Sequence, residues 1–126
     1  MSAVFKIMAG VMALGFVLVG LSWWIVPAFA AQMLGMELLV GVGLSSQIAD
    51  LAAFFLTLGG TILIGLLGPN RVWLYPPIML LGLATIGRLI AWRLYGADLA
   101  IDMIAVEAVA IAILLFNVRE LPKHVT

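Results

Sequence analysis

Four stretches of this sequence are apolar over about 20 residues each, the length that a helix needs to cross a bilayer core of roughly 30 Å. We expect membrane spans over residues 3–26, 46–67, 76–95 and 99–118. Pro27 closes the first span, and Gly68 and Pro69 close the second, with Gly68 expected in the left-handed conformation that often ends a helix. Pro76 and Pro77 suit the first turn of the third span, where a missing N–H costs little.

The composition supports a membrane protein and excludes most other classes. Apolar residues make up 66% of the 126 residues and charged residues 10%, against about 45–50% and about 25% in soluble domains. A soluble domain of this size cannot bury so much apolar surface. A soluble enzyme and a disordered chain are therefore excluded. The short connections leave no room for a water-soluble domain, so we expect one all-α four-helix bundle over residues 1–126.

The charged and metal-ligating residues are too few for several kinds of site. The net charge is zero, so no basic patch is available for nucleic acid. Cysteine is absent, which excludes disulfides and thiolate ligands, and the one histidine, His124, lies next to the C-terminus. We therefore expect no metal site and no cofactor.

The connection between the first two spans, residues 27–44, is itself apolar. Pro27 fits the start of a short helix, and Phe29 and Met33 are neighbours one turn apart. We expect an interfacial helix that lies across the outer mouth of the bundle. The first apolar run exceeds the 7–15 residues typical of a signal peptide, so we interpret it as a retained span.

The lysines and arginines predict the orientation of the chain. One side of the membrane carries Lys6, Arg71, Arg119 and Lys123, and the other carries only Arg93. Because positive charge favours the cytoplasmic side, we expect both termini in the cytoplasm. Aromatic residues are expected at the two interfaces, with Trp73 and Tyr75 inside and with Trp23, Trp24, Trp92 and Tyr95 outside.

Small residues recur along the first span, which has no ionisable residue after Lys6. They are Ala9, Gly10, Ala13, Gly15 and Gly20. Small residues let helices approach closely in lipid. This surface can form a contact in a homo-oligomer or a larger membrane complex, or it can serve packing inside one bundle.

Three ionisable residues on different spans are expected at similar depth. Helix rise places Asp50 roughly 7 Å, Arg88 roughly 10 Å and Glu107 roughly 13 Å from the same outer face. Charges inside a membrane face the bundle interior and pair with one another. Two carboxylates beside one arginine leave a net negative charge, unless one is protonated or another cation joins them.

Two further charges are expected at the rim of this cluster, namely Arg93 and Asp102. Arg93 is turned by about 140° from Arg88 along the helix, and Asp102 lies near the outer interface. The cluster of Asp50, Arg88 and Glu107 has two interpretations. It is either an ion-pair network that fixes how the helices pack, or a polar pocket that binds or processes a ligand.

Several of these residues also carry a family resemblance. Asp50-Leu51-Ala52-Ala53, Gly59-Gly60, Gly87-Arg88-Leu89, Tyr95-Gly96 and Glu107 resemble a family of small bacterial four-helix membrane proteins. That family is known as a domain of unknown function and is distantly similar to DoxX-like proteins. The resemblance covers roughly residues 11–115 and implies the fold, the polar cluster and a bacterial inner membrane, but no activity. The chain departs from the family at Tyr95, where an acidic residue is more usual.

Three functions remain open from the sequence. A binding or accessory module ranks first, because no nucleophile lies beside a base, and its partners would be the bilayer, a lipophilic small molecule or another membrane protein. A membrane enzyme ranks second, with Asp50 or Glu107 moving a proton on a lipophilic substrate and Arg88 stabilising negative charge. A small proton-coupled transporter ranks third, because the two halves show no inverted repeat.

Overall fold

The computed structural model describes residues 2–120, and every regular element in that range is a helix. Four stretches are long and apolar enough to cross a membrane: Ala3–Ile25, Gly41–Leu67, Arg71–Tyr95 and Ile101–Arg119. The prediction of an all-α fold with four spans is therefore confirmed. Lys123 and His124, which entered the sequence predictions, lie outside the described residues.

The helices follow one another with short connections. In chain order they are α1 (Ser2–Ile25), α2 (Pro27–Met33), α3 (Gly41–Ser46), the π-helical turn η1 (Gln47–Leu51), α4 (Ala52–Leu67), the 3₁₀ turn η2 (Arg71–Leu74), α5 (Tyr75–Tyr95) and α6 (Ile101–Glu120). Helices α3, η1 and α4 are continuous and together form the second span. It begins at Gly41, earlier than the residue 46 expected from the sequence.

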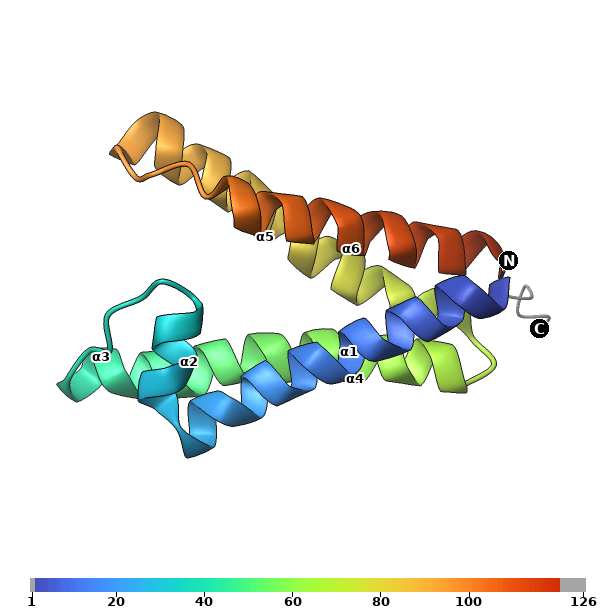
Figure 1. Cartoon of the computed structure of the whole chain (residues 1–126), viewed down its shortest axis with the longest axis horizontal. Helices are drawn as coiled ribbons and strands as arrows, with labels where there is room; N and C mark the ends of the chain where they lie inside the picture. The colour runs from blue at the N-terminus through green and yellow to red at the C-terminus, as the bar shows by residue number, and fades with distance from the viewer. Residues whose placement is uncertain (1, 121–126) are drawn as a thin grey trace.

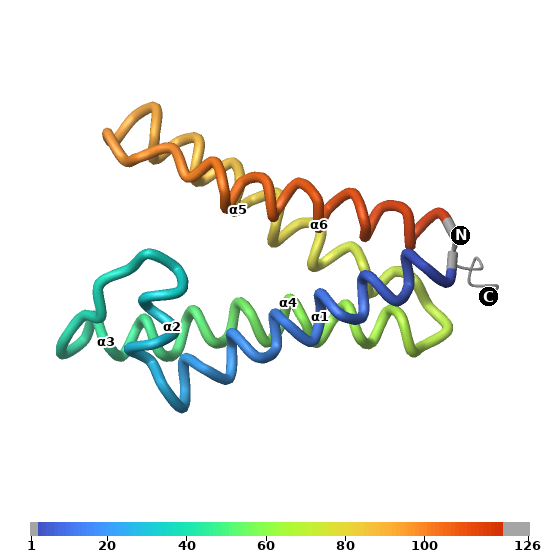
Figure 2. Tube along the Cα trace, in the orientation of Figure 1, coloured from blue at the N-terminus to red at the C-terminus, as the bar shows by residue number. Residues whose placement is uncertain are grey.

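The spans form two pairs that diverge from one another (Figures 1 and 2). Helix α1 packs along α4, and α5 packs along α6. The pairs meet where α1 begins and α6 ends, which we call the closed end (Figure 1). They separate toward α2 and the loop of residues 96–100, which we call the open end. The bundle is therefore V-shaped, and its two arms are farthest apart at the open end.

Small residues let α1 and α4 pack closely. A Cβ atom on Gly59 would lie 2.6 Å from the Ala13 carbonyl oxygen, and one on Gly20 would lie 2.7 Å from Leu56 Cγ. Ala9 and Ala13 are fully buried. Most of the small residues of α1 thus serve packing inside the bundle. Gly15 is the exception, because a Cβ there meets nothing within 4 Å, and the expected contact of this span with another chain stays a prediction.

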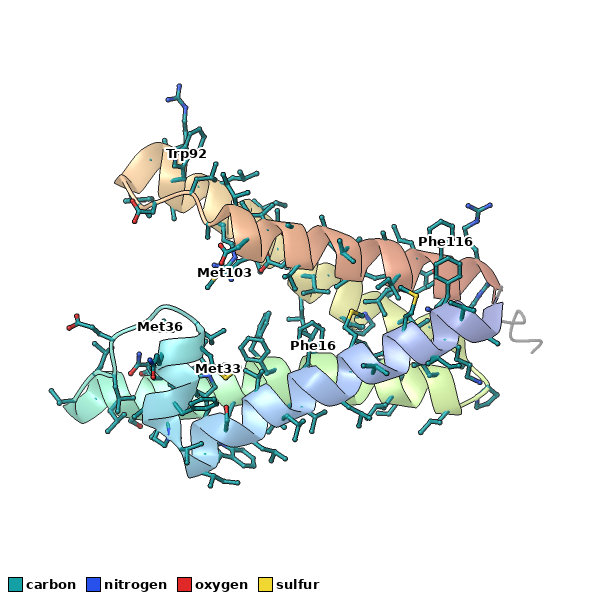
Figure 3. The ribbon with its side chains drawn as sticks, in the orientation of Figure 1. Phe16, Met33, Met36, Trp92, Met103 and Phe116 are labelled. Carbon is teal, nitrogen blue, oxygen red and sulfur yellow. The ribbon has the colours of Figure 1, made fainter. Side chains whose placement is uncertain are left out.

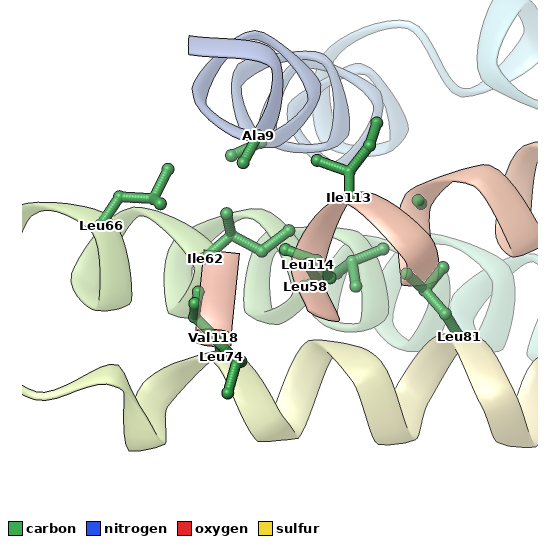
Figure 4. Close-up of a cluster of buried hydrophobic side chains, with 11 residues drawn as sticks. Ala9, Leu58, Ile62, Leu66, Leu74, Leu81, Ile113, Leu114 and Val118 are labelled. Atoms are coloured by element: carbon green, nitrogen blue, oxygen red, sulfur yellow. The ribbon is translucent and has the colours of Figure 1, made fainter. Parts of the chain in front are cut away.

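A continuous apolar core joins the two pairs near the closed end (Figure 4). Leu58 and Ile62 of α4 meet Leu81 of α5 and Leu114 of α6, and all four are buried. Because lipid tails are as apolar as these side chains, no hydrophobic effect drives the helices together, and close packing stabilises this contact.

Polar contacts at the closed end tie the chain termini to the bundle. The Asn117 side-chain nitrogen donates to the Phe5 carbonyl oxygen and to the Ile113 carbonyl oxygen, each at 2.9 Å. Arg71 of η2 donates to the Val118 carbonyl oxygen at 2.6 Å. These bonds connect α1, α6 and the 68–74 connection, so that the two arms share one anchored end.

The open end is built on the apolar connection after the first span. Helix α2 starts at Pro27 as predicted and lies across the ends of α1 and α4 (Figure 1). The chain then runs without regular secondary structure over residues 36–40. The buried Gln47 side chain accepts from the Leu39 N–H at 2.8 Å and donates to the Glu37 carbonyl oxygen at 2.9 Å. The connection is therefore an ordered cover on the open end of this arm.

Two local predictions were wrong. Gly68 is extended, with φ −93° and ψ 173°, because the following Pro69 shifts the residue before it from helical to extended conformations. Trp23 is fully buried beside Ala30, Ala31 and Ala52, so it anchors α2 to the bundle and not to the bilayer interface. Small side chains on α2 and α4 leave the room that its ring occupies.

The close approach of α1 and α4 makes two neighbouring glycines differ in how well they tolerate an added side chain. Gly59→Ala places a Cβ against the Ala13 and Val17 backbone, so we expect it to destabilise the protein by about 1–3 kcal/mol. Gly60→Ala meets nothing within 4 Å and should leave stability unchanged or slightly raised. Thermal unfolding in detergent measures both. Equal melting temperatures for the two variants would contradict the packing described here.

Candidate functional site

The α5–α6 pair carries an ion pair at the level where the arms begin to separate. Arg88 Nε donates to Glu107 Oε2 at 3.0 Å, and the Thr85 hydroxyl donates to Glu107 Oε1 at 2.9 Å. The Arg88 side chain is 35% exposed and the Glu107 side chain 9%. Both carboxylate oxygens are thus held by donors from α5. The turn after α5 ends at Gly96 in the left-handed conformation (φ +72°), which lets α6 return alongside.

This ion pair lines a cavity of about 300 Å³ between the two arms. The lining comes from all four spans and from the end of α2. Its polar residues lie on the α5–α6 side, namely Arg88, Asp102 and Glu107. Its opposite wall is apolar and largely aromatic, with Phe16 on α1 and with Phe54 and Phe55 on α4. The cavity therefore has one polar and one apolar wall.

Aromatic contacts stiffen the apolar wall. The rings of Phe54 and Phe55 pack edge to face with centroids 5.1 Å apart, and Phe16 lies 6.2 Å from Phe55. Toward the open end, Met33 of α2 and Met103 of α6 face one another across the space between the arms (Figure 3). Methionine is flexible and fits surfaces of variable shape. The mouth of the cavity is therefore lined by adaptable side chains and its base by rigid ones.

Only some of the N–H donors of the Arg88 guanidinium have a hydrogen-bond partner in residues 2–120. Of its five N–H donors, the one on Nε binds Glu107. Within residues 2–120, neither terminal amino group of Arg88 has a hydrogen-bond partner. Unpaired donors inside a bilayer are costly. Because Arg88 lines the cavity, its terminal amino groups are available to hydrogen-bond a molecule bound there.

Asp50 does not join this cluster. It is exposed on η1, and within the described range it makes no hydrogen bond or ion pair. The depth calculation assumed nearly parallel spans, whereas the arms separate toward the open end, where η1 lies. The polar cluster is therefore the Arg88–Glu107 pair with Thr85.

The two residues expected at the rim, Asp102 and Arg93, differ in their position relative to the cavity. Asp102, in the first turn of α6, lines the cavity, and it has no partner among the described residues. Arg93 is exposed in the last turn of α5 and is not part of the lining. Its charge there complements the negative end of the helix dipole. Asp102 is thus a second carboxylate of the cavity, while Arg93 lies outside it.

Some lining residues were missed by the sequence analysis. Thr85 lies three residues before Arg88, a spacing that puts both side chains on one face of α5. A hydroxyl one turn from a membrane-embedded arginine was a usable signal. The aromatic wall had no such signal, because phenylalanines in an apolar span are common. Among the described residues, no group of three histidine, aspartate or glutamate side chains is placed to hold a metal ion.

The ion pair makes a prediction about stability. Arg88→Leu leaves the Glu107 carboxylate buried without its cation, so we expect a loss of ~3 kcal/mol, the lower end of the range for buried pairs because Arg88 is partly exposed. The double variant Arg88→Leu, Glu107→Leu removes both charges and should recover most of that loss. Asp50→Asn is the matched control and should melt like the unchanged protein. If Arg88→Leu and the double variant Arg88→Leu, Glu107→Leu melt at the same temperature in detergent, the ion pair does not stabilise the fold.

Comparison with known proteins adds no further constraint. No protein-family model, curated protein or solved structure matches this chain. The resemblance to the DoxX-like proteins stays an expectation from the residues that carry it. The functional conclusion therefore depends on the chemistry of the cavity between the two arms.

Proposed function

We propose that this chain is a membrane-embedded binding module whose cavity holds a lipophilic small molecule with a polar head. The observation that carries the proposal is the partly used Arg88, whose four terminal N–H donors have no partner in residues 2–120 and which lines a cavity of about 300 Å³. That volume lies at the lower end of the range for small-molecule sites, about 300–1,000 Å³. A ligand of this kind satisfies the donors and covers the aromatic wall at the same time.

Binding is better supported than proton transfer. A residue that shuttles protons needs an accessible oxygen, whereas the Glu107 side chain is only 9% exposed and each of its oxygens already accepts a hydrogen bond from α5. Asp50, the other candidate base, is exposed and is not among the residues that line the cavity. The carboxylate of Glu107 orients Arg88, and Arg88 offers its remaining donors to a ligand.

The proposal places the chain in a bacterial inner membrane with both termini in the cytoplasm. The supporting observation is the excess of lysine and arginine at the closed end, with Lys6 on α1, Arg71 on η2 and Arg119 on α6. Only Arg93 is found at the open end. The cavity then opens in the outer half of the bilayer.

Because the chain has no cysteine, single cysteines test this orientation directly. Asp98→Cys lies in the exposed loop at the open end, and Pro69→Cys lies in the exposed loop at the closed end. We expect a membrane-impermeant maleimide to label Asp98→Cys in intact cells and to label Pro69→Cys only after lysis. The reverse pattern would place the termini outside.

The binding proposal predicts what purifies with the protein. After mild detergent extraction, mass spectrometry should find a small lipophilic molecule at about one per chain. Arg88→Lys keeps a cation for Glu107 but loses the planar fork of donors, so we expect recovery of the molecule to fall about tenfold. Arg93→Lys changes an exposed arginine outside the cavity lining and should retain it. Equal recovery from both variants would show that Arg88 does not hold a ligand.

A further inference from the structure

We propose, building on the binding function above, that the ligand is a single-chain amphiphile with an uncharged, oxygen-accepting head group at Arg88 and an apolar tail between α1 and α6. The head group is assigned by the charges of the cavity, and the tail by the apolar grooves that continue from it. The ligand enters from the lipid, because the grooves lie between helices on the side of the bundle.

A ligand that covers Arg88 must supply acceptors for its four terminal N–H donors, which have no protein partner within residues 2–120. A quaternary ammonium has no lone pair to offer them, so it leaves their desolvation uncompensated. A carbonyl or a similar oxygen accepts these hydrogen bonds, and hydrogen bonds from a charged donor are stronger than neutral ones. The head group is therefore an acceptor.

Among acceptors, the local charge favours an uncharged head over an anion. Glu107 at 3.0 Å already neutralises Arg88. Asp102 adds a second carboxylate to the lining, and no cation within residues 2–120 pairs with it. An anionic head would therefore meet a lining with a formal charge of −1 and would also lose its hydration. A carbonyl oxygen makes the same hydrogen bonds without this repulsion.

The tail path follows two apolar grooves along α1. The first has a volume of about 510 Å³, is lined by Gly15 and Ser22, and shares Phe16, Met33 and Val106 with the cavity. The second has a volume of about 600 Å³ and lies between α1 and α6.

The two grooves meet at Met12 and Val106 and lead toward the closed end. From Ser22 to Ile7 they follow roughly 22 Å of the α1 axis, a large part of a hydrocarbon core of roughly 30 Å. Because the cavity holds only about 300 Å³, it takes the head group, and the tail occupies the grooves.

Three amphiphiles with the same tail test the head group. They are N,N-dimethylhexadecanamide, hexadecanoate and hexadecyltrimethylammonium, each titrated into the full-length protein in detergent and followed by native mass spectrometry at neutral pH. We expect one dimethylamide per chain, bound at least about tenfold more tightly than either charged compound, and weakened at least about tenfold by Arg88→Lys. Equal or tighter binding of hexadecanoate or of the ammonium would overturn the head-group assignment while leaving a binding module. No saturable binding of any of the three would overturn the binding function as well.

A variant of Gly15 tests the tail path. A Cβ there meets nothing within 4 Å, so Gly15→Leu fills the groove without forcing the helices apart. We expect it to weaken dimethylamide binding about tenfold, as the loss of about two buried methylene groups would. Gly82→Leu on α5 also has open space, lies outside both grooves, and should bind like the unchanged protein. Equal binding by the two variants would overturn the tail path, and the same spectra report whether either substitution changes the oligomeric state.

Discussion

The arrangement of the helices depends on side-chain hydrogen bonds at the closed end, where little water is available to replace them. Asn117 is 1% exposed, and its side-chain nitrogen donates hydrogen bonds to the Phe5 and Ile113 carbonyl oxygens. Arg71 reaches the Val118 carbonyl oxygen at the same end. Lipid cannot replace such bonds, so they join the two helix pairs at the closed end. The pairs are then free to diverge at the other end, and that divergence creates the cavity.

The open end has no comparable bonds between its two arms among the described residues. Hydrogen bonds there stay within one arm: Gln47 holds the connection over residues 36–40, and Thr85 and Arg88 hold Glu107. Across the opening, flexible methionines face one another (Figure 3). One arm therefore supplies a preorganised polar wall and the other an apolar wall, and the space between them suits a molecule with both characters.

Much of this structure follows from the sequence, because bilayer thickness and proline positions leave few choices. The length of the apolar stretches predicts the four spans, and the conformational preference of proline predicts the start of α2 at Pro27. The cost of charge in lipid predicts that Arg88 pairs with a carboxylate. The divergence of the arms is not predicted by these rules, because the angle between the two helix pairs depends on side-chain packing around residues such as Leu58 and Leu81. For that reason Asp50, although expected at a similar depth to Arg88, lies on a surface that Arg88 does not share.

The most direct test of the central claim is a crystal structure grown from a lipidic mesophase. We expect the arms to diverge as described and an elongated non-protein molecule to lie between α1 and α6. Its head-group oxygen should lie about 3 Å from the terminal nitrogens of Arg88. A structure in which Met33 packs directly on Met103 and the arms close over Arg88 would contradict the claim, because no ligand could then reach those donors.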